Sequence, residues 1–491
     1  GITANANDMA ITAAQTTIES ILKADLVIGE DAQTKIDFET ANEIHFDVNN
    51  TELLNLTGAK ISGSGVSTGS FGHIIGTTIE LPDNTIAIDG VVYSLDDWEH
   101  PGGNQIRLFG GNDVSVQYRM IHAFHGEDTR KVMPVVGKLL NYNKDYTFDS
   151  EFEKELKEEV KKVVLPHKMY ATPGFKYRVL LYCSNYVILM YYYVIYGANF
   201  KLCTLLGIAE ALIGLNVQHD ANHGAISRKP FWNDILGYGA DLIGGNKYLW
   251  LQQHWTHHAF TNDNIRDPDA KSMEPFLIFH NYNAESPNRK YITKYQYIYM
   301  IPLFSLYWLS SIFSSEIFSG LQFSVNEYSE INFKNSYIQS KIGISIILRL
   351  VYLYLKCFSQ FYHYDTTTAM IYIIFSSFVS SLMLAIPFSL SHNFENVERF
   401  PSKIDWYKSQ VETSCTYGGK YIGYLCGGLN YQIEHHLFPR MSSAWYPYIQ
   451  ETVMNVCKKH KIRYAYYPTF LENFKSTIKY VSSISNKKKS T

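Results

Sequence analysis

Five apolar stretches constrain the fold of this 491-residue chain more than any other feature. A helix needs about 20 mostly apolar residues to cross a lipid bilayer. Four of the stretches form two pairs, each joined by a short connection, over residues 179–197 with 202–217 and residues 342–358 with 369–390. We expect four membrane-spanning helices arranged as two hairpins.

The fifth apolar stretch, residues 296–313, is interpreted as an interfacial or re-entrant helix. It is rich in aromatic residues, which favour the headgroup region of a membrane; these are Tyr295, Tyr297, Tyr299, Tyr307 and Trp308. A fifth span would put residues 219–258 and 432–436 on opposite sides of the bilayer. Lys and Arg residues flank the first hairpin before residue 179 and after residue 217, which predicts that those flanks are cytosolic.

Composition excludes several other classes of protein. The chain has 43 Lys and Arg against 46 Asp and Glu, so nothing indicates a nucleic-acid partner. A hydrophobic content of 46% excludes disorder over most of the chain. The six cysteines include no Cys-x-x-Cys pair, which argues against a disulfide scaffold and a zinc–thiolate site.

Seven of the 17 histidines fall into three clusters with helical spacing. Residues at positions i, i+3 and i+4 share one face of a helix, so each cluster can direct its side chains at one point. Seven imidazoles exceed the four ligands of one tetrahedral zinc ion, and a dinuclear metal site explains them. His219 follows the end of the second predicted span, and His392, just past the end of the last one, is a further candidate ligand. The clusters are His219 and His223; His254, His257 and His258; and Gln432, His435 and His436.

The clusters resemble the histidine boxes of the membrane fatty-acyl desaturase superfamily. The runs that carry the resemblance are residues 216–224, 253–258 and 434–441. Gln432 in the third box resembles the front-end desaturases, which insert a double bond between an existing one and the carboxyl end. The resemblance covers about residues 85–475 and looks closest to delta-5 acyl desaturases of the diatom and related algal type.

The resemblance implies a mainly α-helical, polytopic membrane fold with four transmembrane helices and a cytosolic helical cap. It implies two non-haem iron ions, and as partners O2, a fatty-acyl substrate carried by CoA or by phospholipid, and membrane lipid. Asp220 and Glu434 are interpreted as acceptors that orient ligand imidazoles. The implied iron ligands are His219, His223, His254, His257, His258, His392, Gln432, His435 and His436.

A second histidine pattern precedes the spans. Asp89-Gly90 between two apolar runs predicts a β-hairpin, and His100-Pro101-Gly102-Gly103 follows it. His122 lies 22 residues after His100, which leaves room for a helical hairpin between two axial haem ligands. This segment resembles the small α+β cytochrome b5 fold with haem b. His125 is the rival second ligand, and a degenerate domain without haem is the alternative.

The predicted organisation has five parts. They are a variable leader (1–75), a cytochrome b5-like haem domain (76–145), an amphipathic linker helix (146–178), the desaturase domain (179–475) and a basic tail (476–491).

The predicted function is front-end, delta-5 desaturation of polyunsaturated fatty-acyl chains in the endoplasmic reticulum membrane. Electrons are expected from NADH-cytochrome b5 reductase through the haem, with the haem domain and boxes on the cytosolic face. The alternatives are delta-6 or delta-4 acyl and delta-8 sphingolipid desaturation, hydroxylation, and a non-catalytic haem- or metal-carrying electron-transfer protein. The sequence leaves the acyl carrier, acyl-CoA or phospholipid, open.

Overall fold

The computed structural model describes residues 81–486 except 97, 125–129, 141, 264–265, 272–275, 280–290, 308–335 and 399–404, together with short strands between residues 2 and 62. The chain divides into two units, residues 1–79 and 80–491.

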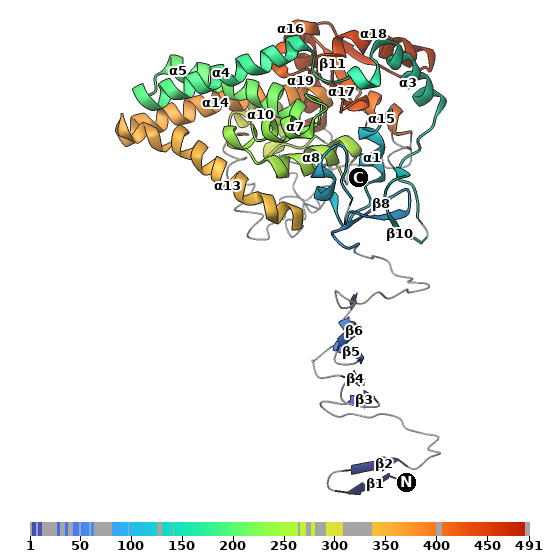
Figure 1. Cartoon of the computed structure of the whole chain (residues 1–491). Helices are drawn as coiled ribbons and strands as arrows, with labels where there is room; N and C mark the ends of the chain where they lie inside the picture. Colours follow the sequence, from blue (N-terminus) through green and yellow to red (C-terminus); the bar gives the residue numbers. More distant parts are fainter. Residues whose placement is uncertain are drawn as a thin grey trace. The chain divides into compact units, whose positions relative to one another are not determined.

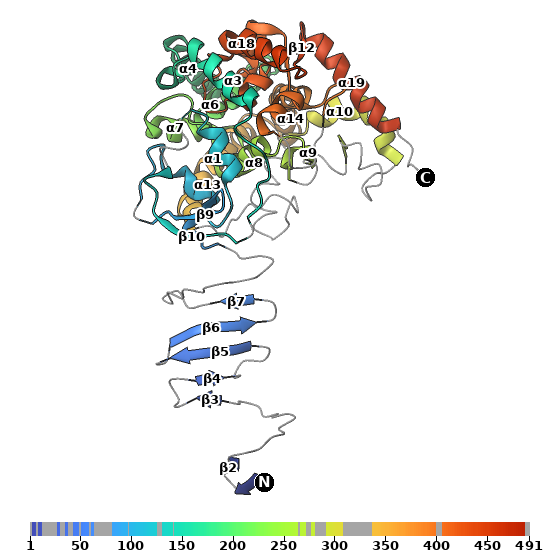
Figure 2. The same cartoon turned by 90° about the vertical axis from the view of Figure 1, so that its right-hand side faces the viewer.

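The first unit contains short antiparallel strands. β1 (Ile2–Asn5) pairs with β2 (Asp8–Ile11). A five-stranded sheet comes next, with its strands in chain order (Figure 2). Its strands are β3 (Val27–Gly29), β4 (Lys35–Asp37), β5 (Glu43–Val48), β6 (Thr51–Thr57) and β7 (Lys60–Ser62). The predicted leader thus contains strands that its composition does not indicate.

Four helices among the described residues are long and apolar enough to cross a membrane, as the sequence predicts. They are built on α4 (Pro173–Tyr196), α5 (Phe200–Leu212), α13 (Ser336–Lys356) and α14 (Thr366–His392), which lie side by side in Figure 1. The two hairpin connections meet at one end of this bundle, where Ala198 N donates to Gln360 Oε1 at 2.9 Å. The other ends of α5 and α14 lead to the histidines.

The second span continues past α5 without a break. A π-helical segment, η3 (Ile213–Gln218), joins α5 to α6 (His219–Asn222). Gln218 Nε2 donates to Gly214 O at 2.8 Å inside this wider turn. The sequence-based expectation that His219 and His392 follow the ends of their spans is therefore corrected, because both residues lie within the last turns of spanning helices.

The fifth apolar stretch forms only a short helix in its described part. α10 (Gln296–Phe304) follows η6 (Tyr291–Tyr295) and has nine residues, fewer than the about 20 needed to span. It packs on α19 (Phe470–Asn486) through a core that includes Phe304 and Val481. Residues 308–313, with Trp308, lie outside the described residues, so the interfacial placement stays a prediction.

The segment before the spans forms a small sheet and helices. β8 (Thr85–Ile88) and β9 (Val91–Ser94) make the predicted hairpin, and Asp89 and Gly90 have the positive φ angles, 51° and 78°, of a two-residue turn. The remaining elements are β10 (Val135–Lys138), which pairs with β9, η1 (Asn104–Phe109), α1 (Ser115–Ile121) and the expected amphipathic helix α3 (Glu151–Val163).

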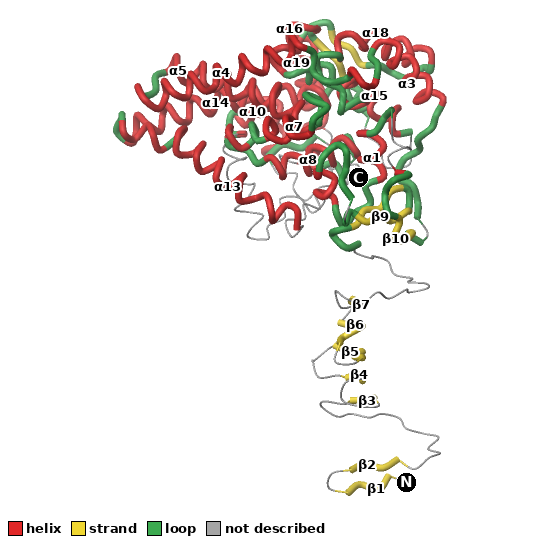
Figure 3. The backbone as a smooth tube through the Cα atoms, in the orientation of Figure 1, coloured by secondary structure: helices red, strands yellow, loops and turns green. Residues whose placement is uncertain are grey.

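The helices outside the bundle form the predicted cap and share one hydrophobic core with the small sheet. This core joins Ile86 and Leu108 to Leu251 and Phe438, and Figure 3 shows the strands beside the helices. Two short strands, β11 (Cys415–Tyr417) and β12 (Ala465–Tyr467), pair in parallel. The helices of the cap are α7 (Pro230–Gly237), η4 (Asp241–Ile243), α8 (Lys247–Ala259), α9 (Pro268–Lys271), α15 (Trp406–Glu412), α16 (Gly419–Cys426), α17 (Gln432–Leu437) and α18 (Tyr446–Lys459). Two short helices, η2 (Pro166–Lys168) and η7 (Phe358–Tyr362), belong to the first and third candidate spans.

Candidate metal centre and histidine pocket

Four elements carry the box histidines to one place. α6 and the last residue of α14 bring His219 and His392 to the ends of two spans. α8 and α17 contribute the second and third boxes. α8 starts where the Asn246 side chain accepts hydrogen bonds from the Tyr248 and Leu249 amides, a usual N-cap. All eight candidate histidines are buried.

The histidines form two groups rather than one. Within each group the candidate ligand atoms all lie within 4.8 Å of one another. The two groups share α8, because His254 belongs to the first and His257 to the second. His258 lies between them, with Nε2 3.1 Å from His254 Nε2 and its ring stacked on His436 at 4.1 Å. The first group is His219, His223, His254 and His435, and the second is His257, His392 and His436.

Buried lone pairs in these groups fit metal ions. Both ring nitrogens of His219, Nε2 of His435 and Oε1 of Gln432 are buried and have no hydrogen-bond partner among the described residues. Buried polar atoms in proteins are normally hydrogen-bonded. A cation in the first group would accept a lone pair from His435 Nε2 and from one ring nitrogen of His219, and a cation in the second group would accept one from Gln432 Oε1. Nitrogen and oxygen donors suit iron.

The electrostatic setting keeps most of these rings neutral. Burial, followed by the charges of neighbouring histidines, lowers the pKa of His254, His258, His435 and His436 well below 6.5. A neutral imidazole has the lone pair that a metal needs.

His257 differs because carboxylates surround it. Its burial lowers the pKa, but Asp267 and Asp269 outweigh that effect and raise it to about 9. His257 Nδ1 donates to Asp267 Oδ1 at 2.9 Å, while Nε2 lies 3.3 Å from His392 Nε2. A carboxylate that holds the outer nitrogen of a ligand histidine is a common feature of metal sites.

Three more histidines are oriented by partners that the sequence did not reveal. His436 Nδ1 lies 2.9 Å from Gln410 Oε1. His435 Nδ1 lies 3.0 Å from the Tyr446 hydroxyl. His392 Nδ1 lies 3.0 Å from the carbonyl oxygen of Thr413. Only Asp267 had a sequence signal, an Asp-Pro-Asp run ten residues after a box histidine.

The expected orienting roles of Asp220 and Glu434 are not what the contacts show. Asp220 Oδ2 accepts hydrogen bonds from Ser442 and Ser443, and its other oxygen is 4.0 Å from His219 Nδ1. Glu434 accepts from Thr416 at 2.9 Å and from Tyr464 at 2.6 Å. Each carboxylate is one residue from a box histidine, and successive helical residues point about 100° apart. Burial raises the pKa of Glu434 to about 7.

Gln432 lies against the second group, as its place in the third box predicts. Its amide nitrogen is 2.9 Å from His392 Nε2 and 3.1 Å from His436 Nε2. The two orientations of a Gln amide are assigned from hydrogen bonding. A half-turn of the amide would place Oε1 beside the same two nitrogens, where it would face a shared cation.

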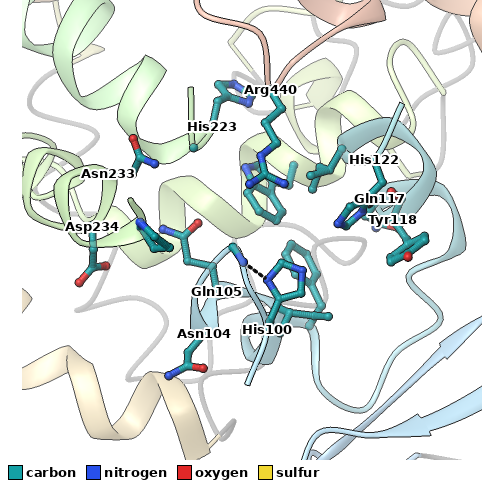
Figure 4. A pocket seen from close by; sticks show the side chains of 18 of the residues that line it. His100, Asn104, Gln105, Gln117, Tyr118, His122, His223, Asn233, Asp234 and Arg440 are labelled. Atoms are coloured by element: carbon teal, nitrogen blue, oxygen red, sulfur yellow. Dashed lines mark hydrogen bonds between the residues drawn. The ribbon is translucent and has the colours of Figure 1, made fainter. Parts of the chain in front are cut away.

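His100 and His122 face each other across a pocket (Figure 4). Their ring centroids are 5.8 Å apart at an interplanar angle of 76°. Two imidazole–metal bonds of about 2.0 Å, with each centroid about 1.2 Å behind its nitrogen, would separate the centroids by about 6.4 Å. Both rings line two adjoining cavities of about 250 and 320 Å³. His125, the rival ligand, lies outside the described residues.

The two facing rings differ in readiness for a haem iron. His122 Nδ1 donates to the Tyr118 carbonyl at 2.9 Å, so the neutral ring has its lone pair on Nε2. Gly102 N donates to Nδ1 of His100 at 2.9 Å, which puts the ring proton on Nε2. Burial and then the charge of Arg440 lower the pKa of His100 to about 4, so this ring is neutral too. For Nε2 of His100 to bind iron, the ring proton must move from Nε2 to Nδ1. The ring must also rotate, because Nδ1 then no longer accepts the hydrogen bond from Gly102 N.

The comparisons with known proteins decide the family. The chain matches the family model described as fatty acid desaturase over residues 198–468. The chain belongs to the fatty acid desaturase family. This desaturase is 30% identical over 428 residues to the acyl-lipid (7-3)-desaturase of Rebecca salina, which covers 84% of this chain and 92% of the relative.

Two relatives from Dictyostelium discoideum are similar over the same extent. Identity to the acyl-lipid (8-3)-desaturase B is 30% over 440 residues, covering 82% of this chain and 91% of the relative. Identity to the Delta(5) fatty acid desaturase A is 29% over 439 residues, with the same coverage. The protein is therefore a fatty-acyl desaturase, an oxidoreductase, with four candidate membrane helices and buried histidine groups of the kind that a non-haem diiron centre requires.

Proposed function

We propose that this desaturase performs front-end, delta-5 desaturation of polyunsaturated fatty-acyl chains, with O2 and with electrons from a haem in the same chain. The observation that carries the proposal is that His223 belongs to the first histidine group and also lines the cavity between His100 and His122. Among the described residues, this contact joins the two candidate redox sites directly.

The assignment of ligands follows the two groups. The first group would hold one iron and the second group the other, with His258 between the groups and Gln432 beside the second. When bound, iron with O2 supplies an oxidant strong enough to take hydrogen from an unactivated methylene, chemistry that belongs to the metal. The chain contributes ligand geometry: Asp267, Gln410 and Tyr446 fix the outer nitrogens of their histidines.

Electron delivery uses residues 76–145 as the haem domain. His100 and His122 would hold haem b as axial ligands, and a reductase that uses NADH would reduce it. The shared hydrophobic core between the small sheet and α8 supports this role, because it fixes the haem pocket against the helix that carries the second box. A covalent connection between donor and acceptor also raises the effective concentration of the donor.

The names of the relatives guide the substrate class. Two of them are named acyl-lipid desaturases, which favours a lipid-bound acyl chain over acyl-CoA. Their printed regiochemistries, (7-3), (8-3) and Delta(5), differ, so a second position of desaturation is the alternative to be tested.

Localisation to the endoplasmic reticulum, with the boxes on the cytosolic face, is part of the proposal. It rests on the Lys and Arg residues that flank the first hairpin on the histidine side of the bundle.

Expression in yeast, with several polyunsaturated acids fed in parallel, tests the proposal. New double bonds are located by mass spectrometry, and a bond at delta-5 is expected. His436→Ala is expected to abolish the product while the protein stays in the membrane. His460→Ala is the matched control, because His460 pairs with Glu155 outside both groups. A product at another carbon would overturn the regiochemistry, and full activity of His436→Ala would overturn the ligand assignment.

A further inference from the structure

The pocket between His100 and His122 contains a cation, Arg440, that pairs with no residue among those the structure describes. Arg440 lies just after the third box and lines both cavities beside His100 and His122. Its side chain is half-buried, and it makes no hydrogen bond or ion pair with any residue in the described part of the chain. Figure 4 shows the guanidinium extending into the space between His100, His122 and His223.

Two glycines make room for this side chain. A Cβ atom at Gly102 would lie 3.3 Å from Arg440 Nη2, and one at Gly224 would lie 3.8 Å from Nε. Gly102 belongs to the His-Pro-Gly-Gly run and Gly224 ends the first histidine box. Arg440 therefore passes between the segment that carries a candidate haem ligand and the segment that carries candidate iron ligands.

The positively charged side chains that line these cavities favour an anionic ligand. Arg228 also lines both cavities, and Lys341 lines the first. The one carboxylate among the described residues lining the first cavity is Asp234, which already pairs with Lys247. The second cavity has no carboxylate among its described lining residues. Partly desolvated cations without partners are costly, so the pocket favours a ligand that carries its own negative charge.

We propose that Arg440, assisted by Arg228, binds the carboxylates of the haem and so holds its edge beside the first histidine box. The inference rests on the proposed haem in this pocket. Haem b is a flat apolar ring with two carboxylates, and the pocket offers apolar walls, including Phe109 and Trp255, together with these two cations. Arg440 is a positioning residue: guanidinium–carboxylate pairs fix orientation as well as energy.

Haem with free carboxylates and its dimethyl ester, in which both carboxylates are neutral, provide the test. The purified full-length enzyme is loaded with each, and transfer of the haem to an excess of haem-free globin is timed. Hydrogen bonds to charged groups contribute about 1.5–3 kcal/mol, so esterification should speed haem loss from the parent about tenfold or more. Arg440→Gln should lose unmodified haem faster by a similar factor and should respond little to esterification. Arg440→Lys, which keeps the charge, should fall between them.

Lys420→Gln is the matched control, because Lys420 is an exposed cation outside both cavities. It should behave like the parent with both haems. Equal retention of haem and ester by the parent enzyme, or an unchanged response to esterification in Arg440→Gln, would overturn this inference even though haem binds. A parent that binds no haem at all would instead overturn the proposed electron delivery, so the two failures are distinct.

Discussion

Replacing Asp267 by Asn should weaken metal binding without removing any proposed ligand. The carboxylate is buried and receives three hydrogen bonds. Oδ1 accepts from His257 Nδ1 and from Asp269 N, both at 2.9 Å. Oδ2 accepts from Asn262 N at 2.7 Å. An Asn side chain has one oxygen, so in its place an NH2 group faces one of these donors.

The size of the effect follows from these contacts. If the Asn oxygen keeps the His257 and Asp269 bonds, the Asn262 amide meets another donor, and a buried donor without a partner costs about 1–3 kcal/mol. The charge that stabilises the His257 proton at Nδ1 is lost as well. Partners of this kind change metal affinity or activity by about 10–100-fold. We expect the affinity for iron to fall by a factor in this range, while most of the protein still folds and inserts into the membrane.

Iron content of the purified enzyme, measured after titration with a chelator, checks the prediction. Double bonds formed per membrane-inserted protein give a second readout. Asp269→Asn is the control, because its carboxylate lies 3.7 Å from His257 Nδ1, beyond a hydrogen bond. If both variants lost iron equally, or if Asp267→Asn kept iron like the parent, the proposed orientation of His257 would be wrong.

Three further predictions address other parts of the molecule. His100→Ala should remove the haem absorbance and most activity while two irons per chain remain; normal turnover without the haem band would show that a separate electron donor suffices. Gln432→His should retain some desaturation and Gln432→Ile should lose it, since Ile leaves buried partners unpaired at about 1–3 kcal/mol each; equal product from Gln432→Ile and the parent would remove this residue from the site. Lys356→Met should lower the free energy of unfolding in detergent by about 3–5 kcal/mol, because Glu210 then lies within the bundle without its ion-pair partner. Adding Glu210→Leu to this variant should restore the free energy of unfolding; no recovery in the double variant would contradict a simple ion pair.

Periodicity predicted much of the architecture. The four spans and the Asp89-Gly90 turn depend on local rules, apolar length and positive φ, which a sequence displays directly. The box spacing predicted that each cluster lies on a helix and points to one place; α8 and α17 are helices that carry the second and third boxes, but each divides its histidines between the two groups.

The distribution of histidines between two groups was beyond local rules. His254 and His257 lie on one helix but join different groups: His254 lies with His219, His223 and His435, and His257 lies with His392 and His436. The orienting partners Gln410 and Tyr446 come from α15 and α18. Gln410 is distant in sequence from His436, and no sequence motif marks either partner. Proximity in sequence favoured Asp220 and Glu434 instead, whose carboxylates contact other neighbours.

The π-helical turn at Ile213–Gln218 lies between the part of the second span that packs in the bundle and the segment that carries the first histidine box. Such a turn holds one more residue than an α-helical turn, and absorbs it without rotating the next helical segment by about 100°. His219 therefore has the same direction relative to the bundle that a regular helix shorter by one residue would give it. A relative that lacked one residue here, with a regular α-helix in its place, would direct its histidines the same way. Deletion of one residue at this point can thus leave the metal site unchanged, whereas a deletion within α6 would turn His223 away from it.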